Sequence, residues 1–235
     1  MPKSPFLKPF PAAIAFFAKK LPIPTENWKT ISEEYQAISF VIAGITKIGI
    51  LKDLQDAITD ALDKGISPEK FREQFADIMV RRGWTSGFSP YRQNLIFSQA
   101  VRTAYNYGRF EQLTNPSTLK PYWQWRWRDS VQPREHHKAQ DGKVFPANDE
   151  CFKAIMPQPF GCRCTVYALS QRQLEKEGLT LSTPPKLSAI AEPNFSKGFP
   201  KSLSEQRQQL IERAIASLPP NLAKLLEEDV ENYNK

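Results

Sequence analysis

The organisation of this chain turns on one short stretch, Pro121-Tyr122-Trp123-Gln124-Trp125-Arg126-Trp127-Arg128. Its tryptophans occupy every second position, and a tyrosine and polar residues fill the positions between them. Successive side chains of a β-strand point to opposite faces, so this alternation predicts a half-buried strand. Three large rings on one face favour core packing, because each buries a large apolar area. The alternative is a surface on which nucleic-acid bases stack.

Upstream of this strand, apolar residues recur at helical spacing. The pair Ser67-Pro68 is typical of a helix start and Lys64-Gly65 of a helix end. The apolar residues from Ile38 to Ile45 also fit a helix, which Gly44 and Gly49 would weaken or break. The predicted helices cover residues 12–20, 32–45, 51–63, 68–79 and 91–113.

Downstream, the sequence predicts a second strand over Thr165–Ala168 and a helix from Ser170 to Gly178 that begins with a capping box. Two amphipathic helices, over 203–217 and 221–232, follow in the tail. We therefore expect an α+β protein in four parts. These are a proline-rich arm (1–24), a helical region (25–120), a strand-containing module with a His/Cys motif (121–180), and a proline-rich linker with a helical tail (181–235).

Positive charge is concentrated in the middle of the chain. The formal net charge is +7, and the segment 81–128 alone holds eight basic residues against one acidic residue. Such a segment suits nucleic acid or an acidic partner, and the candidate contact residues are Arg102, Arg109, Arg126 and Arg128. The first two lie seven residues apart and so share a helix face. The alternative is a solvated face that the acidic segment 52–80 balances.

Three cysteines do not suggest a disulfide framework. The sequence shows neither a secretory signal nor an apolar run of about 20 residues, the length that a membrane span needs. We therefore expect a protein made in a reducing cytoplasm, with no membrane partner.

The residues with the most distinctive chemistry are two adjacent histidines and a Cys-x-Cys pair. His137, Cys162 and Cys164 are ligand types that zinc prefers, and a structural site takes four ligands. Asp141 is the candidate that we favour for the fourth, with Cys151 and His136 as alternatives. The alternative is that the cysteines are buried as small apolar residues and that His137 forms a hydrogen bond within a turn. A thiol nucleophile or a zinc hydrolase lacks any specific motif in this sequence.

Several blocks of sequence follow one another in a recognisable order. They are Ala13–Lys20, Ser39–Gly44, Gly65–Pro68, Gln99–Arg109, Pro133-Arg134 with His137 and Asp141-Gly142, and finally Gly161-Cys162-Arg163-Cys164. In this order, from about Ala12 to Gly178, the chain resembles the phage Mu F-like minor head proteins, the phage head-morphogenesis family.

The resemblance implies a minor capsid protein of a tailed phage or prophage that binds the portal protein and the major capsid or scaffold protein during head assembly. It implies residence in the virion, after a period in the host cytoplasm, and contact with packaged DNA in some relatives. We therefore expect a structural protein and not an enzyme. The alternatives are a nucleic-acid-binding protein that acts through residues 81–128 and, less favoured, a zinc-dependent hydrolase.

Overall fold

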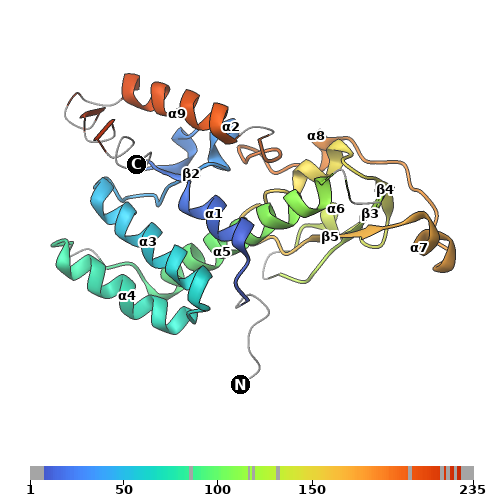
Figure 1. The fold of residues 1–235 in the computed structure, drawn as a ribbon, viewed down its shortest axis with the longest axis horizontal. Helices are drawn as coiled ribbons and strands as arrows, with labels where there is room; N and C mark the ends of the chain where they lie inside the picture. The colour runs from blue at the N-terminus through green and yellow to red at the C-terminus, as the bar shows by residue number, and fades with distance from the viewer. Residues whose placement is uncertain are drawn as a thin grey trace.

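A computed structural model describes residues 8–228, except 85–86, 116, 118–119, 131–132, 201–202, 218–219, 221–222 and 225–226. The longer helices gather on one side of the molecule, a small sheet with three short helices lies on the other, and α5 reaches from the first to the second (Figure 1). The elements are α1 (Pro11–Ala18), β1 (Leu21–Pro22), η1 (Trp28–Thr30), α2 (Glu33–Gln36), β2 (Ser39–Phe40), α3 (Ile48–Lys64), α4 (Pro68–Arg81), α5 (Pro90–Thr114), β3 (Tyr122–Arg126), α6 (Glu135–Lys138), β4 (Val144–Pro146), η2 (Glu150–Ala154), β5 (Thr165–Leu169), α7 (Gln171–Lys176), α8 (Leu187–Ile190) and α9 (Leu203–Ser217). The α+β class is confirmed.

The helical side is built from α1, α3, α4 and α5, which pack around one apolar core. Local signals set its helix ends. The Ser67 hydroxyl accepts a hydrogen bond from the backbone N–H of Lys70, and Pro68 is the first residue of α4. Helix α3 ends at Gly65, whose φ of 67° is left-handed. Ser89 caps α5 in the same way as Ser67 caps α4.

The helix predicted over 32–45 is wrong beyond Gln36. Helix α2 stops there, and β2 pairs in parallel with β1. The backbone N–H groups of Leu21 and Ile23 donate to the carbonyls of Ile38 and Phe40 at 2.9 and 3.0 Å. Pairing with a distant segment therefore overrides the helical spacing of the apolar residues.

The sheet on the other side has the order β4-β3-β5, and both pairings are antiparallel. The tryptophan strand, β3, is its central strand. Trp123 and Trp125 are buried in the second core, and Trp127 lies partly buried beyond the end of β3. Core packing, and not base stacking, is therefore the role of the first two rings.

Helix α5 contributes to both cores, with Phe97 and Ala104 in the first and Tyr107 and Leu113 in the second. It passes close to α1 at Gly108, where an added Cβ would lie 2.8 Å from the Phe10 ring. The absence of a side chain at this position permits the close crossing of the two helices.

The carboxy-terminal segments lie across both sides. The capping box predicted at Ser170 is present, and Gly178 follows α7 with a φ of 62°. Leu210 and Ile211 of α9 pack against Leu21 and Tyr35. The second tail helix predicted over 221–232 lies largely outside the described residues.

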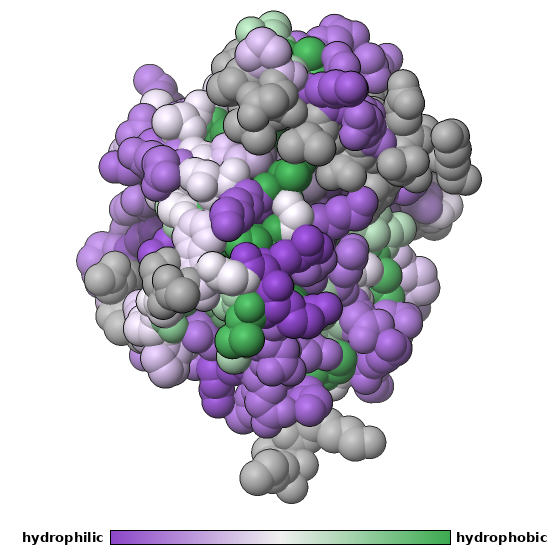
Figure 2. Space-filling model, turned by 90° about the vertical axis from the view of Figure 1, so that its left-hand side faces the viewer, coloured by the Kyte–Doolittle hydropathy of each residue, from purple (hydrophilic) through white to green (hydrophobic). Residues whose placement is uncertain are grey.

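Hydrophilic residues dominate the face that includes α3, α4 and α9, and hydrophobic residues show only in small patches between them (Figure 2). Among the described residues, no helix combines the length and apolarity needed to span a bilayer.

Candidate metal centre

A short helix and a tight turn bring the histidine and the two cysteines together. His137 is the third residue of α6. The cysteines follow a turn in which the backbone N–H of Cys162 donates to the carbonyl of Pro159 at 2.9 Å. Gly161 within that turn has a φ of 75°, a conformation that glycine adopts without strain.

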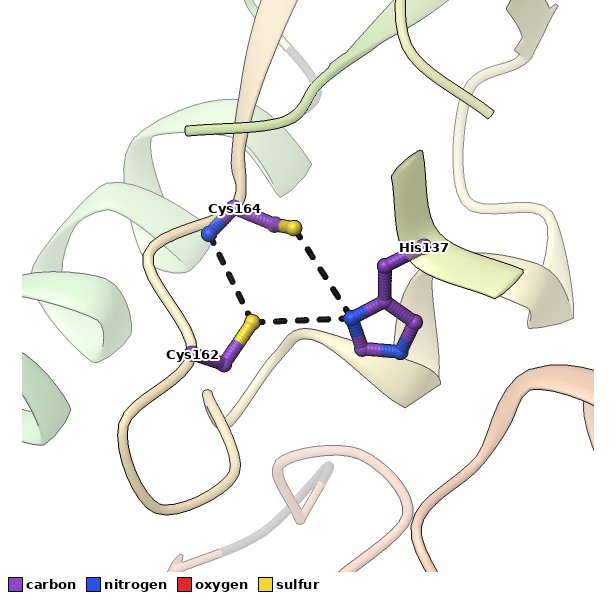
Figure 3. A group of neighbouring side chains, drawn as sticks. All are labelled: His137, Cys162 and Cys164. Atoms are coloured by element: carbon purple, nitrogen blue, oxygen red, sulfur yellow. Dashed lines mark hydrogen bonds between the residues drawn. The ribbon is translucent and has the colours of Figure 1, made fainter. Parts of the chain in front are cut away.

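The ring of His137 is turned so that one nitrogen faces both sulfur atoms (Figure 3). Nδ1 lies 3.6 Å from Sγ of Cys162 and 3.8 Å from Sγ of Cys164. The other nitrogen, Nε2, lies 2.9 Å from the carbonyl oxygen of Ile190. A carbonyl oxygen only accepts hydrogen bonds, so Nε2 carries the hydrogen and the Nδ1 lone pair points at the thiols.

The three side chains are buried, with exposed fractions of 1% for His137, 3% for Cys162 and 2% for Cys164. A hydrogen bond with the Cys164 side chain lowers the pKa of Cys162, against the opposing effect of burial. That same hydrogen bond and burial raise the pKa of Cys164. One thiolate is thus favoured without a metal, and the thiolate is the form that binds metal ions.

The donor atoms fit a metal ion in type and in spacing. Zinc lies about 2.0–2.1 Å from a nitrogen ligand and about 2.3 Å from a sulfur ligand. At tetrahedral angles, these bond lengths place the nitrogen about 3.6 Å from the sulfur. The observed separations are 3.6 and 3.8 Å. A histidine that binds a metal through one ring nitrogen usually donates a hydrogen bond from the other, as Nε2 does here to the Ile190 carbonyl. The cluster therefore has the chemistry and geometry to hold a metal ion.

The structure brings together three of the four residues expected at this site. The fourth, Asp141, faces elsewhere, because its carboxylate accepts the backbone N–H of Trp127 at 2.9 Å and pairs with Arg126 at 3.6 Å. Of the alternatives, the Cys151 thiol is buried and its pKa is raised by burial. The His136 ring packs edge-on against His137, with 4.7 Å between the ring centroids.

The four candidate arginines fall into two groups. The Arg109 guanidinium is partly buried and donates to the Val166 carbonyl through Nε and Nη2, at 3.2 and 2.7 Å. Burial lowers the pKa of Arg102, and the nearby charge of Arg163 adds to this effect. These two arginines lie on α5 between the two sides of the molecule.

The other two candidate arginines lie beside an exposed tyrosine on β5. Arg126 lies over the Tyr167 ring, 5.7 Å from its centroid, and Arg128 donates to the Tyr167 hydroxyl at 3.2 Å. Tyr167 itself is 43% exposed. Of the four candidate arginines, Arg128 is exposed and Arg126 is half-buried, and both lie beside this exposed ring.

Sequence reasoning missed the segment that closes over the histidine. Ile190 accepts from His137, and Glu192 pairs with Arg134 at 2.5 Å. The contact to Ile190 involves a backbone carbonyl, which has no sequence signal. Arg134 with Glu192 is a charge pair 58 residues apart, which the spacing of the chain does not indicate.

Comparison with known proteins gives matches that include the region of the His/Cys cluster. The Phage Mu protein F like family matches residues 52–167. The putative capsid assembly protein F of Escherichia phage Mu is 28% identical over 186 residues, which make up 72% of this chain and 42% of that relative. The Mu-like prophage FluMu F protein of Haemophilus influenzae is 27% identical over 171 residues, or 68% of this chain and 41% of that relative.

The chain thus spans about two fifths of the length of these two relatives. No solved structure is a significant match. The matched residues 52–167 include His137, Cys162 and Cys164, together with β3, β4 and the first part of β5. Over this segment the chain is similar to the Phage Mu protein F like family.

Proposed function

We propose that this chain is a structural component of phage head assembly, in which a zinc ion bound by His137, Cys162 and Cys164 braces the strand-containing module. The observation that carries the proposal is the buried cluster of one imidazole nitrogen and two sulfurs at zinc-like spacing. The role in head assembly is supported by the similarity to the phage Mu relative, a putative capsid assembly protein.

A bracing role accounts for the cluster better than catalysis does. A catalytic zinc needs an open position that substrate reaches. The cluster is at most 3% exposed, and the cavities of 750 and 320 Å³ are lined by other residues. When bound, zinc would supply the attraction that holds two thiolates and an imidazole together. We therefore propose binding, and not turnover, as the work of this protein.

Metal analysis of the purified protein tests the zinc assignment. We expect about one zinc per chain, and a cobalt-substituted form that shows cobalt–thiolate charge-transfer absorption. Cys162→Ser and Cys164→Ser should abolish both signals. Cys151→Ser is the matched control, because this thiol is equally buried but lies outside the cluster, and it should leave both signals unchanged. A wild-type protein without metal, folded normally, would refute the assignment.

Co-expression tests the assembly role separately. We propose the portal protein and the major capsid or scaffold protein as partners, in the host cytoplasm during assembly and then in the virion. The chain should co-purify with the portal protein, with or without scaffold. A failure to associate in both cases would contradict the proposed role while leaving the metal result intact.

A second candidate function is contact with packaged DNA, which the exposed group of Arg126, Arg128 and Tyr167 favours. Cations beside an exposed ring suit a nucleic-acid backbone and its bases. The charge reversals Arg126→Glu and Arg128→Glu should weaken DNA retention and reduce its salt dependence. Unchanged retention would exclude this surface. The double variant Arg102→Glu with Arg109→Glu tests by the same DNA-retention measurement whether the partly buried pair contributes.

A further inference from the structure

A pocket whose lining includes neither His137 nor the cysteines contains a buried cation. The pocket encloses about 320 Å³. Lys20 lines it and is only 6% exposed, and its ammonium donates to the carbonyl of Ala37. The Phe16 ring lies beneath the same ammonium, with 5.3 Å between Nζ and the ring centroid.

This cation lacks a counter-ion within the described part of the chain. The lining of the pocket contains two basic residues, Lys20 and Arg92, and no acidic residue. Arg92 donates to the carbonyl of Ala43 and lies over the Phe88 ring, 4.3 Å from its centroid. Burying a charge without an opposite charge is costly, so the pocket is electrostatically incomplete by itself. Burial accordingly lowers the pKa of Lys20 to about 7.

The walls of the pocket are otherwise apolar and aromatic. Trp28, Phe160 and Phe195 form one rim, in edge-to-face contacts with centroid distances of 5.0 and 5.4 Å. Phe160 is 43% exposed. Gln36 fixes this rim to the rest of the protein, because its side-chain amide donates to the Asn194 carbonyl and accepts from the backbone of Ser196.

These features specify the chemistry of an occupant. An apolar wall needs an apolar partner, and a buried ammonium with spare donors needs one negatively charged acceptor. Exposed aromatic rims beside a desolvated pocket are typical of sites where a partner inserts one or two side chains. A volume of 320 Å³ is near the small end of ligand pockets, which are about 300–1,000 Å³.

We propose that this pocket docks an apolar peptide segment of a partner protein, and that one aspartate or glutamate of the segment pairs with the Lys20 ammonium. The carboxylate supplies the missing charge, and flanking apolar side chains cover the aromatic rim. The inference concerns a site other than the His/Cys cluster and does not depend on metal binding there.

A peptide selection tests the proposal. The probe is a library of random 12-residue peptides displayed on phage and selected against the full chain, with enriched peptides resynthesised for measurement of Kd. We expect enriched peptides to carry a carboxylate flanked by apolar residues. Replacing that carboxylate by its amide, or Lys20 by methionine in the protein, should weaken binding at least tenfold.

Two further variants complete the design. Lys29→Met is the matched control, because Lys29 is exposed and does not line the pocket, and it should leave Kd unchanged. Leu95→Glu places an acid on the pocket lining at a position that is already 36% exposed, so the fold tolerates it while the peptide carboxylate is repelled. Absence of enrichment, enriched peptides without an acid, or a wild-type Kd for the Lys20→Met or the Leu95→Glu protein would each overturn the proposal.

Discussion

The core of the helical side and the core of the strand-containing module are built from different kinds of residues. The helical core around Leu54 and Phe71 consists of apolar side chains from four helices and the loops between them. The core of the strand-containing module combines Trp123 and Trp125 with a buried histidine and three free cysteines. The first core is built from apolar side chains, whereas the second also contains the grouped donor atoms of His137, Cys162 and Cys164, which a metal would satisfy. The difference predicts that the two sides respond to different perturbations.

The largest expected effect follows from removing the proposed zinc. Chelation, or Cys162→Ser, should cost the module more than about 5 kcal/mol, because structural zinc contributes about 10–16 kcal/mol in small zinc domains. Hydrogen-exchange mass spectrometry should show faster exchange over 121–190 while α3 and α4 stay protected. Equal loss of protection on both sides would remove the distinction between the two cores.

The converse perturbation is Leu54→Ala, at a fully buried position of α3. Truncating a leucine in a packed core costs about 2–5 kcal/mol. The loss in the free energy of unfolding, measured by denaturant titration, should be the same with and without chelator. Val80→Ala is the control, because Val80 is 78% exposed and the change should cost less than about 0.5 kcal/mol.

The buried Lys20 of the helical side should make the stability of the protein depend on pH. The pKa of Lys20 is about 7 in the folded protein and 10.5 in its ordinary state, so the unfolded chain binds a proton more readily. This destabilisation is absent above pH 10.5, grows as the pH falls, and is complete below pH 7. Lys20→Met should therefore raise stability at pH 7 by about 1–3 kcal/mol, after the loss of the hydrogen bond to Ala37.

The measurement for this variant is thermal melting at pH 7 and pH 10. The difference between wild type and Lys20→Met should be large at the lower pH and small at the higher one. A difference that does not change with pH would mean that Lys20 is charged in the folded state at both values.

The smallest expected effect concerns the link between the two sides. Arg109 on α5 donates two hydrogen bonds to the Val166 carbonyl on β5. Lys at position 109 retains the charge but provides a single point donor, so Arg109→Lys should cost about 1 kcal/mol. Differential scanning calorimetry should show a lower Tm with the transition still single. Two separate transitions would show that this contact is what couples the two sides.

Local signals made much of the fold predictable. Ser67, Ser89 and Ser170 cap helices through hydrogen bonds to residues three positions later, and such short-range chemistry is visible in sequence. Strand β3 was predictable because its alternation is strict. Strand β4 was not, since it has three residues and ends in Pro146, which argues against a strand. Pairing of β1 with β2 also leaves no local trace.

The candidate site was predictable in part for a similar reason. Ligand chemistry singled out His137 and the two cysteines, and the structure brings them together. Asp141 was the predicted fourth ligand, but its carboxylate accepts a hydrogen bond from the backbone N–H of Trp127. The hydrogen bond between His137 Nε2 and the Ile190 carbonyl depends on the path that the chain takes after α7, which the spacing of residues in the sequence does not specify.

Two adjacent residues of α1 limit how this protein can be dissected. Phe16 stacks on Tyr107 with 3.9 Å between centroids and belongs to the module core, while Phe17 meets Phe40 in the helical core. A fragment that begins at Pro121, or one trimmed to residues 52–167, would lack a ring that its own interior requires. Fragments of this chain should therefore retain the amino-terminal helix. The segment that matches the family is shorter than the segment that needs to fold together.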